Sequence, residues 1–255
     1  RGSSTMSIKK IAFTGLALAA AFACFAALSP ARAADAVLTK AQVEQIVHDY
    51  IVNNPKLIMD SVNNYRFQAA SQQAEEGVKK NEKELTSSAS PVAGNPKGDV
   101  TVVEFFDYNC HYCKGSFPSV QALLKDDKNV RFVFKDFPIL GPSSVEAAKW
   151  ALAAQKQGKY FAFHSAMMLN REPITDDLLK SVSKNVGMDV AAAEKDAESA
   201  DVTNQIEKNV ELAQELGISG TPSFVIGNKV DPGVLSEDEM ENQSTAIRAA
   251  AADKK

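Results

Sequence analysis

The sequence predicts an α/β protein in which a helical subdomain is inserted into a sheet domain and a helical arm precedes that domain. Runs of β-branched and aromatic residues at 100–106, 130–134 and 223–226 are typical of buried strands. Residues 143–216, between the second and third of these runs, carry several helical patterns, although a parallel crossover needs only about a dozen residues. Residues 34–85 carry amphipathic helical patterns of their own, which predict the arm.

The arm begins with a helix whose start is marked by a capping-box pattern of Thr39 and Gln42. Its apolar residues recur at helical spacing and form one stripe: Val43, Ile46, Val47, Tyr50 and Ile51. Pro55 follows Asn54 and fits the first position of a second helix, which turns polar from residue 72 onward. Two short helices bury such stripes poorly against each other, so the stripe packs either on the main domain or on another copy. We expect a homo-oligomer, a dimer in preference to a trimer.

The first 33 residues are expected to lie outside the fold. Residues 1–5 precede Met6 and look like a cloning remnant, and residues 6–33 have the order of a secretory signal peptide. Two lysines are followed by the apolar run 11–28 and by the Ala31-Arg32-Ala33 end that precedes cleavage. Export to the periplasm follows from this interpretation. A retained membrane anchor and a lipid on Cys24 remain alternatives.

Composition restricts the class of protein. The chain is 45% hydrophobic and 24% charged, as in ordinary soluble domains, and its formal net charge is −4. No basic patch indicates a nucleic-acid partner. Beyond the predicted signal peptide the only cysteines are Cys110 and Cys113. A structural disulfide scaffold would use several pairs, so one close pair indicates redox chemistry or metal binding.

The main domain is predicted to span residues 99–255, after a Ser-, Pro- and Gly-containing linker at 86–98. Gly227 and Asn228 form a two-residue hairpin signal that leads into a short fourth strand. A helix over residues 236–252 closes the chain, and the inserted helical subdomain covers about 143–216.

The cysteine pair lies between the first strand and a helix that follows it. A helix N-terminus offers unpaired N–H groups and a partial positive charge, which stabilise a thiolate on Cys110. Cys110 is therefore the expected nucleophile, and Cys113, one turn along the helix, is expected to resolve a mixed disulfide. Structural zinc usually takes four ligands, so a zinc site is disfavoured, whereas two thiolates suffice for Cu(I). We expect no cofactor and no resident metal.

Two segments resemble one known family. Residues Gly98–Lys114, GDVTVVEFFDYNCHYCK, resemble the active-site segment of the DsbA-like thioredoxin superfamily, and residues Gly217–Val225, GISGTPSFV, resemble its cis-proline loop. The resemblance covers about residues 91–255 and implies a thioredoxin-like fold with a redox-active Cys110–Cys113 disulfide. The arm resembles, more weakly, the oligomerisation region of ScsC-type and DsbC-like proteins.

The resemblance also implies roles for other residues. Pro222 would form a cis peptide bond facing the sulfurs, and Thr221 would offer backbone groups to a substrate strand. Glu104 would be a buried acid that exchanges a proton with Cys113, and Lys135, after the second strand, is a candidate partner for it. An edge-exposed Glu104 is the alternative.

The two residues between the cysteines are candidates for tuning the redox chemistry. His111 can hydrogen-bond the Cys110 thiolate or can simply be solvated, and Tyr112 resembles the residue at that place in DsbC.

The expected function is a periplasmic thiol–disulfide oxidoreductase that forms or isomerises disulfides in exported proteins. Its expected partners are those substrate proteins and a membrane redox partner of the DsbB or DsbD type. The alternative is a periplasmic copper(I)-binding protein that uses the same two thiolates.

Overall fold

The computed structural model describes residues 37–253, so the expected remnant, signal peptide and Cys24 lie outside the described residues. The chain divides into two compact units with the boundary after Pro55, and each is described by itself. None of the helices in the described range is both long and apolar enough to cross a membrane.

The first unit contains α1 (Lys40–Asn53), which begins at the predicted capping box. The Gln42 N–H donates to Thr39 Oγ1 over 3.4 Å, and the Thr39 N–H donates to Gln42 Oε1 over 2.9 Å. None of the α1 residues is buried, so the predicted apolar stripe of this helix lies in solvent.

The second unit starts within α2 (Pro55–Lys80), after its first residue, and continues with α3 (Glu82–Leu85). Although α2 is polar from residue 72 onward, its end packs on the rest of the unit. Gly77 and Val78 are buried there, and so is Leu85 of α3. A β-carbon on Gly77 would lie 2.9 Å from the Glu215 carbonyl oxygen, so the glycine permits a close approach of α2 to the end of α9 (Ala200–Glu215).

A five-stranded sheet forms the centre of this unit, in the order β1-β3-β2-β4-β5. Its strands are β1 (Val92–Gly94), β2 (Val100–Phe106), β3 (Val130–Asp136), β4 (Ser223–Ile226) and β5 (Lys229–Pro232). Strands β2 and β3 are parallel, and the other neighbours are antiparallel. The predicted linker 86–98 thus includes the edge strand β1, which the sequence did not predict. The turn at Gly227 and Asn228 joins β4 to β5 as expected.

Side chains along β2 alternate between the two faces of the sheet, and each face has its own core. On one face Val102 and Phe106 pack with α4 (His111–Asp126) and α10 (Glu237–Ala252). On the other face Val103 and Phe105 pack with the docked end of α2, α3 and the end of α9. We call this second side the arm-side face.

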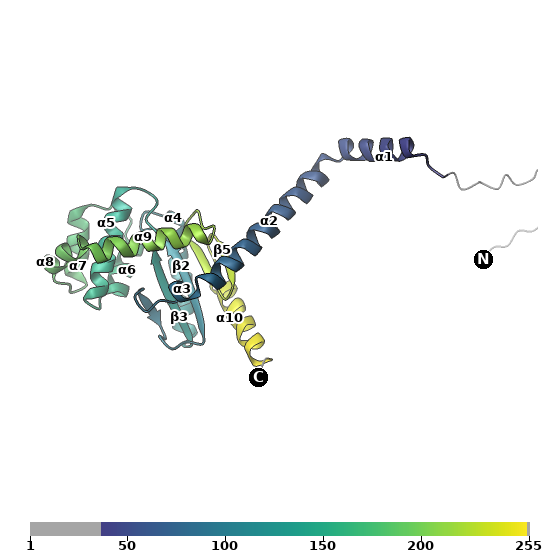
Figure 1. Ribbon diagram of the computed structural model, residues 1–255. Coiled ribbons are helices and arrows are strands. Elements are labelled where there is room, and N and C mark those ends of the chain that lie inside the picture. The colour runs from purple at the N-terminus through teal and green to yellow at the C-terminus, as the bar shows by residue number, and fades with distance from the viewer. Residues whose placement is uncertain (1–36, 254–255) are drawn as a thin grey trace, which may run out of the picture. The chain divides into compact units, whose positions relative to one another are not determined.

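The predicted helical subdomain joins β3 to β4. It consists of α5 (Pro142–Lys156), α6 (Tyr160–Leu169), α7 (Asp176–Asn185), α8 (Val190–Ala197) and α9 (Ala200–Glu215). In Figure 1, α5–α8 cluster at one end of the sheet domain and α9 runs back along it toward β5. The prediction of residues 143–216 for this insertion agrees with these bounds.

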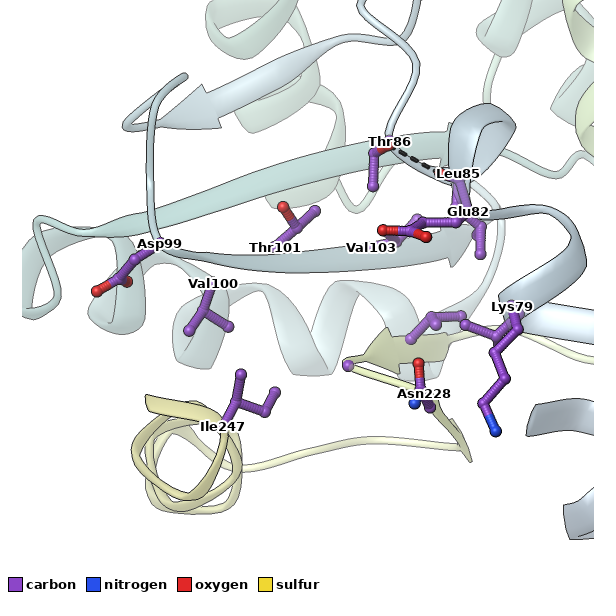
Figure 2. Close-up of a pocket in the computed structure, with 13 residues that line it drawn as sticks. Lys79, Glu82, Leu85, Thr86, Asp99, Val100, Thr101, Val103, Asn228 and Ile247 are labelled. Carbon is purple, nitrogen blue, oxygen red and sulfur yellow. Dashed lines mark hydrogen bonds between the residues drawn. The ribbon is translucent and has the colours of Figure 1, made fainter. Parts of the chain in front are cut away.

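A cavity of about 230 Å³ lies on the arm-side face. Figure 2 shows its lining, with Val103 of β2, Leu85 of α3 and Ile247 of α10 around it. The Thr86 hydroxyl donates to the Glu82 carbonyl over 2.8 Å at its rim. None of the predicted site residues lines this cavity.

Candidate active site

The reactive pair begins at the start of α4, as the sequence predicts. Cys110 is the N-cap residue of α4, with extended backbone angles, and its sulfur accepts a hydrogen bond from the Cys113 N–H over 3.3 Å. The Cys110 thiol donates to the Thr221 carbonyl oxygen over 3.2 Å. Both cysteines are buried free thiols in this structure, which therefore describes the reduced pair.

The two sulfurs differ strongly in acidity. Hydrogen bonding from the Cys113 thiol, followed by contributions from Thr221 and the helix-start N–H groups, lowers the pKa of Cys110 to about 6. Desolvation and the bond to Cys110 instead raise the pKa of Cys113 above its ordinary value. At neutral pH the pair therefore presents one thiolate, on Cys110, and keeps the inner sulfur protonated.

The loop before β4 brings a second segment to the sulfur. The Thr221–Pro222 peptide bond is cis, in agreement with the expectation from the resemblance. The Ser223 hydroxyl donates to the Gly220 carbonyl over 2.8 Å, and the Gly233 N–H donates to the Pro222 carbonyl over 2.8 Å. The first bond braces the loop internally, and the second joins the loop to the residue that follows β5.

Glu104 occupies the interior of the sheet, opposite Phe134 on β3 and Phe224 on β4. Its exposed fraction is 2%, so the edge-exposed alternative is wrong. Desolvation, with a smaller contribution from the negative charge of Cys110, raises the pKa of Glu104 to about 8. The Glu104 charge in turn contributes to the raised pKa of Cys113. A carboxyl group with this pKa can exchange a proton near neutral pH.

The predicted pairing of Lys135 with Glu104 is wrong. Lys135 lies opposite Phe105 in the β2–β3 register, whereas Glu104 lies opposite Phe134, so the two side chains point to opposite faces. The Lys135 ammonium group donates to the Glu84 carbonyl over 2.7 Å and to the Ser90 hydroxyl over 2.8 Å. Burial lowers its pKa to about 8. Lys135 thus anchors α3 and the segment after it on the arm-side face.

His111 and Tyr112 are both exposed on the first turn of α4, and their ring centroids lie 6.1 Å apart. Among the described hydrogen bonds of the Cys110 sulfur, none involves His111. Tyr112 has an exposed fraction of 68% and is free to meet a partner molecule. The tuning role of His111 stays a prediction.

Asp107 is a buried polar residue beside the site that the sequence did not single out. Asp107 accepts hydrogen bonds from the N–H groups of Ile139 and Leu140, over 2.8 and 2.9 Å, and from the Ser144 hydroxyl over 2.7 Å. It therefore joins the loop before Cys110 to the start of α5. An acid at the end of a buried strand was the available signal, but its partners lie more than thirty positions away.

His164 is a packed residue of α6. Its ring is fully buried among aromatic side chains, and Nδ1 lies 3.2 Å from the Tyr108 hydroxyl. Desolvation lowers its pKa to about 3, so this imidazole is neutral at physiological pH.

Within residues 37–253 no group of three or more His, Cys, Asp or Glu side chains is arranged to hold a metal ion. The two sulfurs of Cys110 and Cys113 are the soft donors at the site.

Two family models match different parts of the chain. The DSBA-like thioredoxin domain matches residues 101–247, and the copper resistance protein ScsC N-terminal domain matches residues 40–72. The first match includes the cysteine pair and the cis-proline loop, and the second lies within the arm.

Solved structures and curated relatives agree with the family models. A thioredoxin-like oxidoreductase from Silicibacter pomeroyi DSS-3 is 42% identical, with 66% of this chain and 98% of that chain covered and a TM-score of 0.65. Proteus mirabilis ScsC in a transitional conformation is 26% identical, with 84% and 100% covered and a TM-score of 0.64. The probable disulfide bond formation protein D of Bacillus cereus is 33% identical over 153 residues, 54% of this chain and 71% of that protein.

A further relative is much longer than this chain. The Na(+)/H(+) antiporter NhaA 3 of Salinispora tropica is 28% identical over 163 residues, which are 63% of this chain but only 24% of the antiporter. The likeness therefore concerns about a quarter of that protein. The DSBA-like model, by contrast, matches more than half of this chain and includes both active-site segments. The chain belongs to the DsbA-like thioredoxin-domain family of thiol–disulfide oxidoreductases, with an ScsC-type N-terminal segment.

Proposed function

We propose that the protein works in the periplasm as an oxidoreductase that exchanges disulfides with cysteines of other exported proteins. The observation that carries this proposal is the Cys110 sulfur, with a pKa lowered to about 6, hydrogen-bonded to the cis-proline loop over 3.2 Å. A thiolate in this position can attack a substrate disulfide and is also a good leaving group. A membrane partner of the DsbB or DsbD type would reset the pair.

Oxidation starts from the Cys110–Cys113 disulfide. A substrate thiolate attacks the Cys110 sulfur, and Cys113 leaves and takes up a proton. A second substrate thiolate then attacks the substrate sulfur of the mixed disulfide and releases the Cys110 thiolate. Two electrons pass from the substrate to the pair. In the opposite direction the Cys110 thiolate attacks a substrate disulfide, and Cys113 resolves the mixed disulfide after losing its proton.

Single cysteine variants test the assignment. Cys113→Ser cannot resolve, so it should accumulate disulfide-linked complexes with substrate proteins, visible on non-reducing gels and lost with reductant. Cys110→Ser should form none and should have no oxidase activity. Complexes that form with Cys110→Ser and not with Cys113→Ser would reverse the two roles.

We further propose that the arm makes the protein a homo-oligomer, at least a dimer, and that this assembly supports disulfide isomerisation. The support is the exposed apolar stripe of α1, in which no residue is buried, together with the match to an ScsC N-terminal segment. Burying one such side chain is worth about 1.5–3 kcal/mol, so several shared between copies offset the entropy cost of association. Paired sites can hold a misfolded chain while its disulfides are exchanged.

A truncation tests the arm without damage to the domain. The deletion should cover residues 34–64 only, because Val78 and Leu85 belong to the arm-side core. We expect a monomer by light scattering that oxidises dithiols as the parent does and has lost most isomerase activity on a scrambled protein. A truncated protein that has the same number of copies per particle as the parent would refute the proposed role of the arm.

Cu(I) retention through the same two thiolates is the competing function, and the adjacent soft donors are the observation in its favour. The two functions separate in one experiment. A disulfide oxidoreductase turns over reduced substrate protein with a glutathione redox buffer and no copper. A copper protein binds one Cu(I) per chain and shows no such turnover.

A further inference from the structure

A second groove lies directly beside the active site. It has a volume of about 430 Å³ and runs between α2 and the loop that carries the cis-proline. Phe67, Ala70 and Ala74 of α2 form one wall, and residues 216–223 form the other. Thr221 and Pro222 line this groove and also belong to the active site, since the Thr221 carbonyl accepts from the Cys110 thiol. The groove is therefore continuous with the place where a substrate sulfur would be attacked.

The position of the α2 wall follows from its docked end. Gly77 packs against the end of α9, where a β-carbon would lie 2.9 Å from the Glu215 carbonyl oxygen. The Asn81 side chain donates to Gly77 O over 3.1 Å and to Glu215 Oε2 over 2.8 Å. These contacts hold the last turns of α2, so the turns before Gly77 pass beside the loop that follows α9.

The lining of the groove has a distinct chemistry. None of its sixteen lining residues, all within the described range, has a charged side chain, although 24% of the chain is charged. Ile218 is buried at its floor, whereas Phe67 has an exposed fraction of 73%. A neutral, partly apolar groove favours uncharged apolar side chains and penalises charges that would lose their water.

We propose that α2 of the arm is a specificity-determining wall of the substrate groove, where Phe67 and Ala70 favour apolar over charged side chains in the polypeptide segment next to the substrate cysteine. The inference rests on the proposed oxidoreductase function and adds a substrate class to it. It also gives the arm a direct role at each active site, independent of any association between copies.

The test uses the full chain and two dithiol peptides that differ only beside one cysteine, where one peptide carries Leu-Phe and the other Glu-Asp. The key variant is Ala70→Glu, which puts a charge into the groove. The matched control is Ala69→Glu, since Ala69 is exposed on the same helix and does not line the groove. Phe67→Ser is a second variant that removes apolar area from the wall without adding charge.

We expect the wild type to oxidise the apolar peptide at least about tenfold faster than the acidic one, as kcat/KM, because burial of one apolar side chain changes binding by that factor or more. Ala70→Glu and Phe67→Ser should each lose most of this preference, and Ala69→Glu should keep it. The reaction with dithiothreitol and the redox potential of the cysteine pair should be unchanged in all variants.

Equal kinetics of Ala70→Glu and Ala69→Glu on both peptides would overturn the groove as a binding site. So would an equal loss with dithiothreitol, which would place the effect at Cys110. A changed mass of Ala70→Glu by light scattering would assign the groove to contacts between copies instead. A wild type that reacts with dithiothreitol but with neither peptide would overturn the oxidoreductase proposal and this one together.

Discussion

Replacement of Glu104 by glutamine separates the two halves of the exchange reaction. Glu104 is buried in the sheet, and its pKa of about 8 leaves about a tenth of it ionised at pH 7. The pKa of Cys113 is raised, so this thiol must lose its proton as it attacks the mixed disulfide. Glutamine keeps the shape of the side chain and cannot accept that proton.

The expected change in the resolution rate follows from these pKa values. A positioned general base accelerates a proton transfer by about 10²–10⁴-fold. Because only about a tenth of the Glu104 side chains are ionised at pH 7, Glu104→Gln should slow resolution of the mixed disulfide by about 10–10³-fold. The attack by Cys110 should change by less than about twofold, because its pKa is lowered chiefly by the hydrogen bond from the Cys113 side chain, and Glu104 is not among the causes. The wild-type advantage should grow from pH 6 to pH 8 and then level off.

Rapid quenching with acid, followed by mass spectrometry, measures both steps as the rise and decay of the mixed disulfide. The exposed Glu211→Gln serves as a control for the chemical change itself. If Glu104→Gln resolves mixed disulfides at the wild-type rate, with the same pH profile, then Glu104 is not the base.

The same substitution has a separate effect on stability. A raised pKa in the folded state means that the protonated carboxyl is favoured by folding, so its contribution is fully present below pH 4.5 and is lost as pH rises through 8. Between these values the wild type should lose up to about 1.4 kcal/mol of unfolding free energy per pH unit relative to Glu104→Gln. Urea unfolding at pH 5 and pH 8 measures this difference, and parallel pH dependences would contradict the buried position.

Three further predictions concern residues away from the sulfurs. The lowered pKa of His164 gives stability that is present above pH 6.5 and lost as pH falls through 3, so urea unfolding should show up to about 1.4 kcal/mol per pH unit that His164→Gln lacks. The lowered pKa of Lys135 gives stability that is present above pH 10.5 and lost as pH falls through 8, and Lys135→Met should lack this dependence in the same assay. Gly77→Ala should lower the unfolding free energy by about 1–3 kcal/mol, because its β-carbon would meet the Glu215 carbonyl oxygen, whereas Gly115→Ala, with open space around it, should be neutral or stabilising in thermal denaturation.

Most of the correct predictions came from short sequence segments and local residue patterns. The helix start at Cys110 and the loop at Pro222 are short segments whose chemistry depends on neighbours in the chain, and the structure brings these two segments together. The buried strands and the helical subdomain are likewise visible as runs and periodicities. The function class followed from the two segments, because their combination is specific even though each is short.

The missed features depend on contacts distant in sequence. Strand β1 has only three residues, Val92–Gly94, and is a strand because it pairs with β3, which no local pattern reports. Lys135 looked like a partner for Glu104 because both lie on neighbouring strands, yet the register of β2 and β3 sends them to opposite faces. The polar pattern from residue 72 gives no sign that the end of α2 is docked, because the close contact there depends on a single glycine, Gly77.

Strand β2 contributes side chains both to the sheet face that carries the cysteine helix and to the arm-side face. Glu104 points from it toward the cysteine helix, and Phe105, the next residue, points toward the arm-side core that also contains Val78 and Leu85. The loop that follows α9 makes the same connection from the other side, since Leu216 packs in the arm-side core while Thr221 bonds to Cys110. A displacement of the docked end of α2 would therefore act on the cis-proline loop before it acted on the sulfurs. Substrate selection should respond to changes in the arm more readily than the redox chemistry itself, which depends on Cys110 and the start of α4.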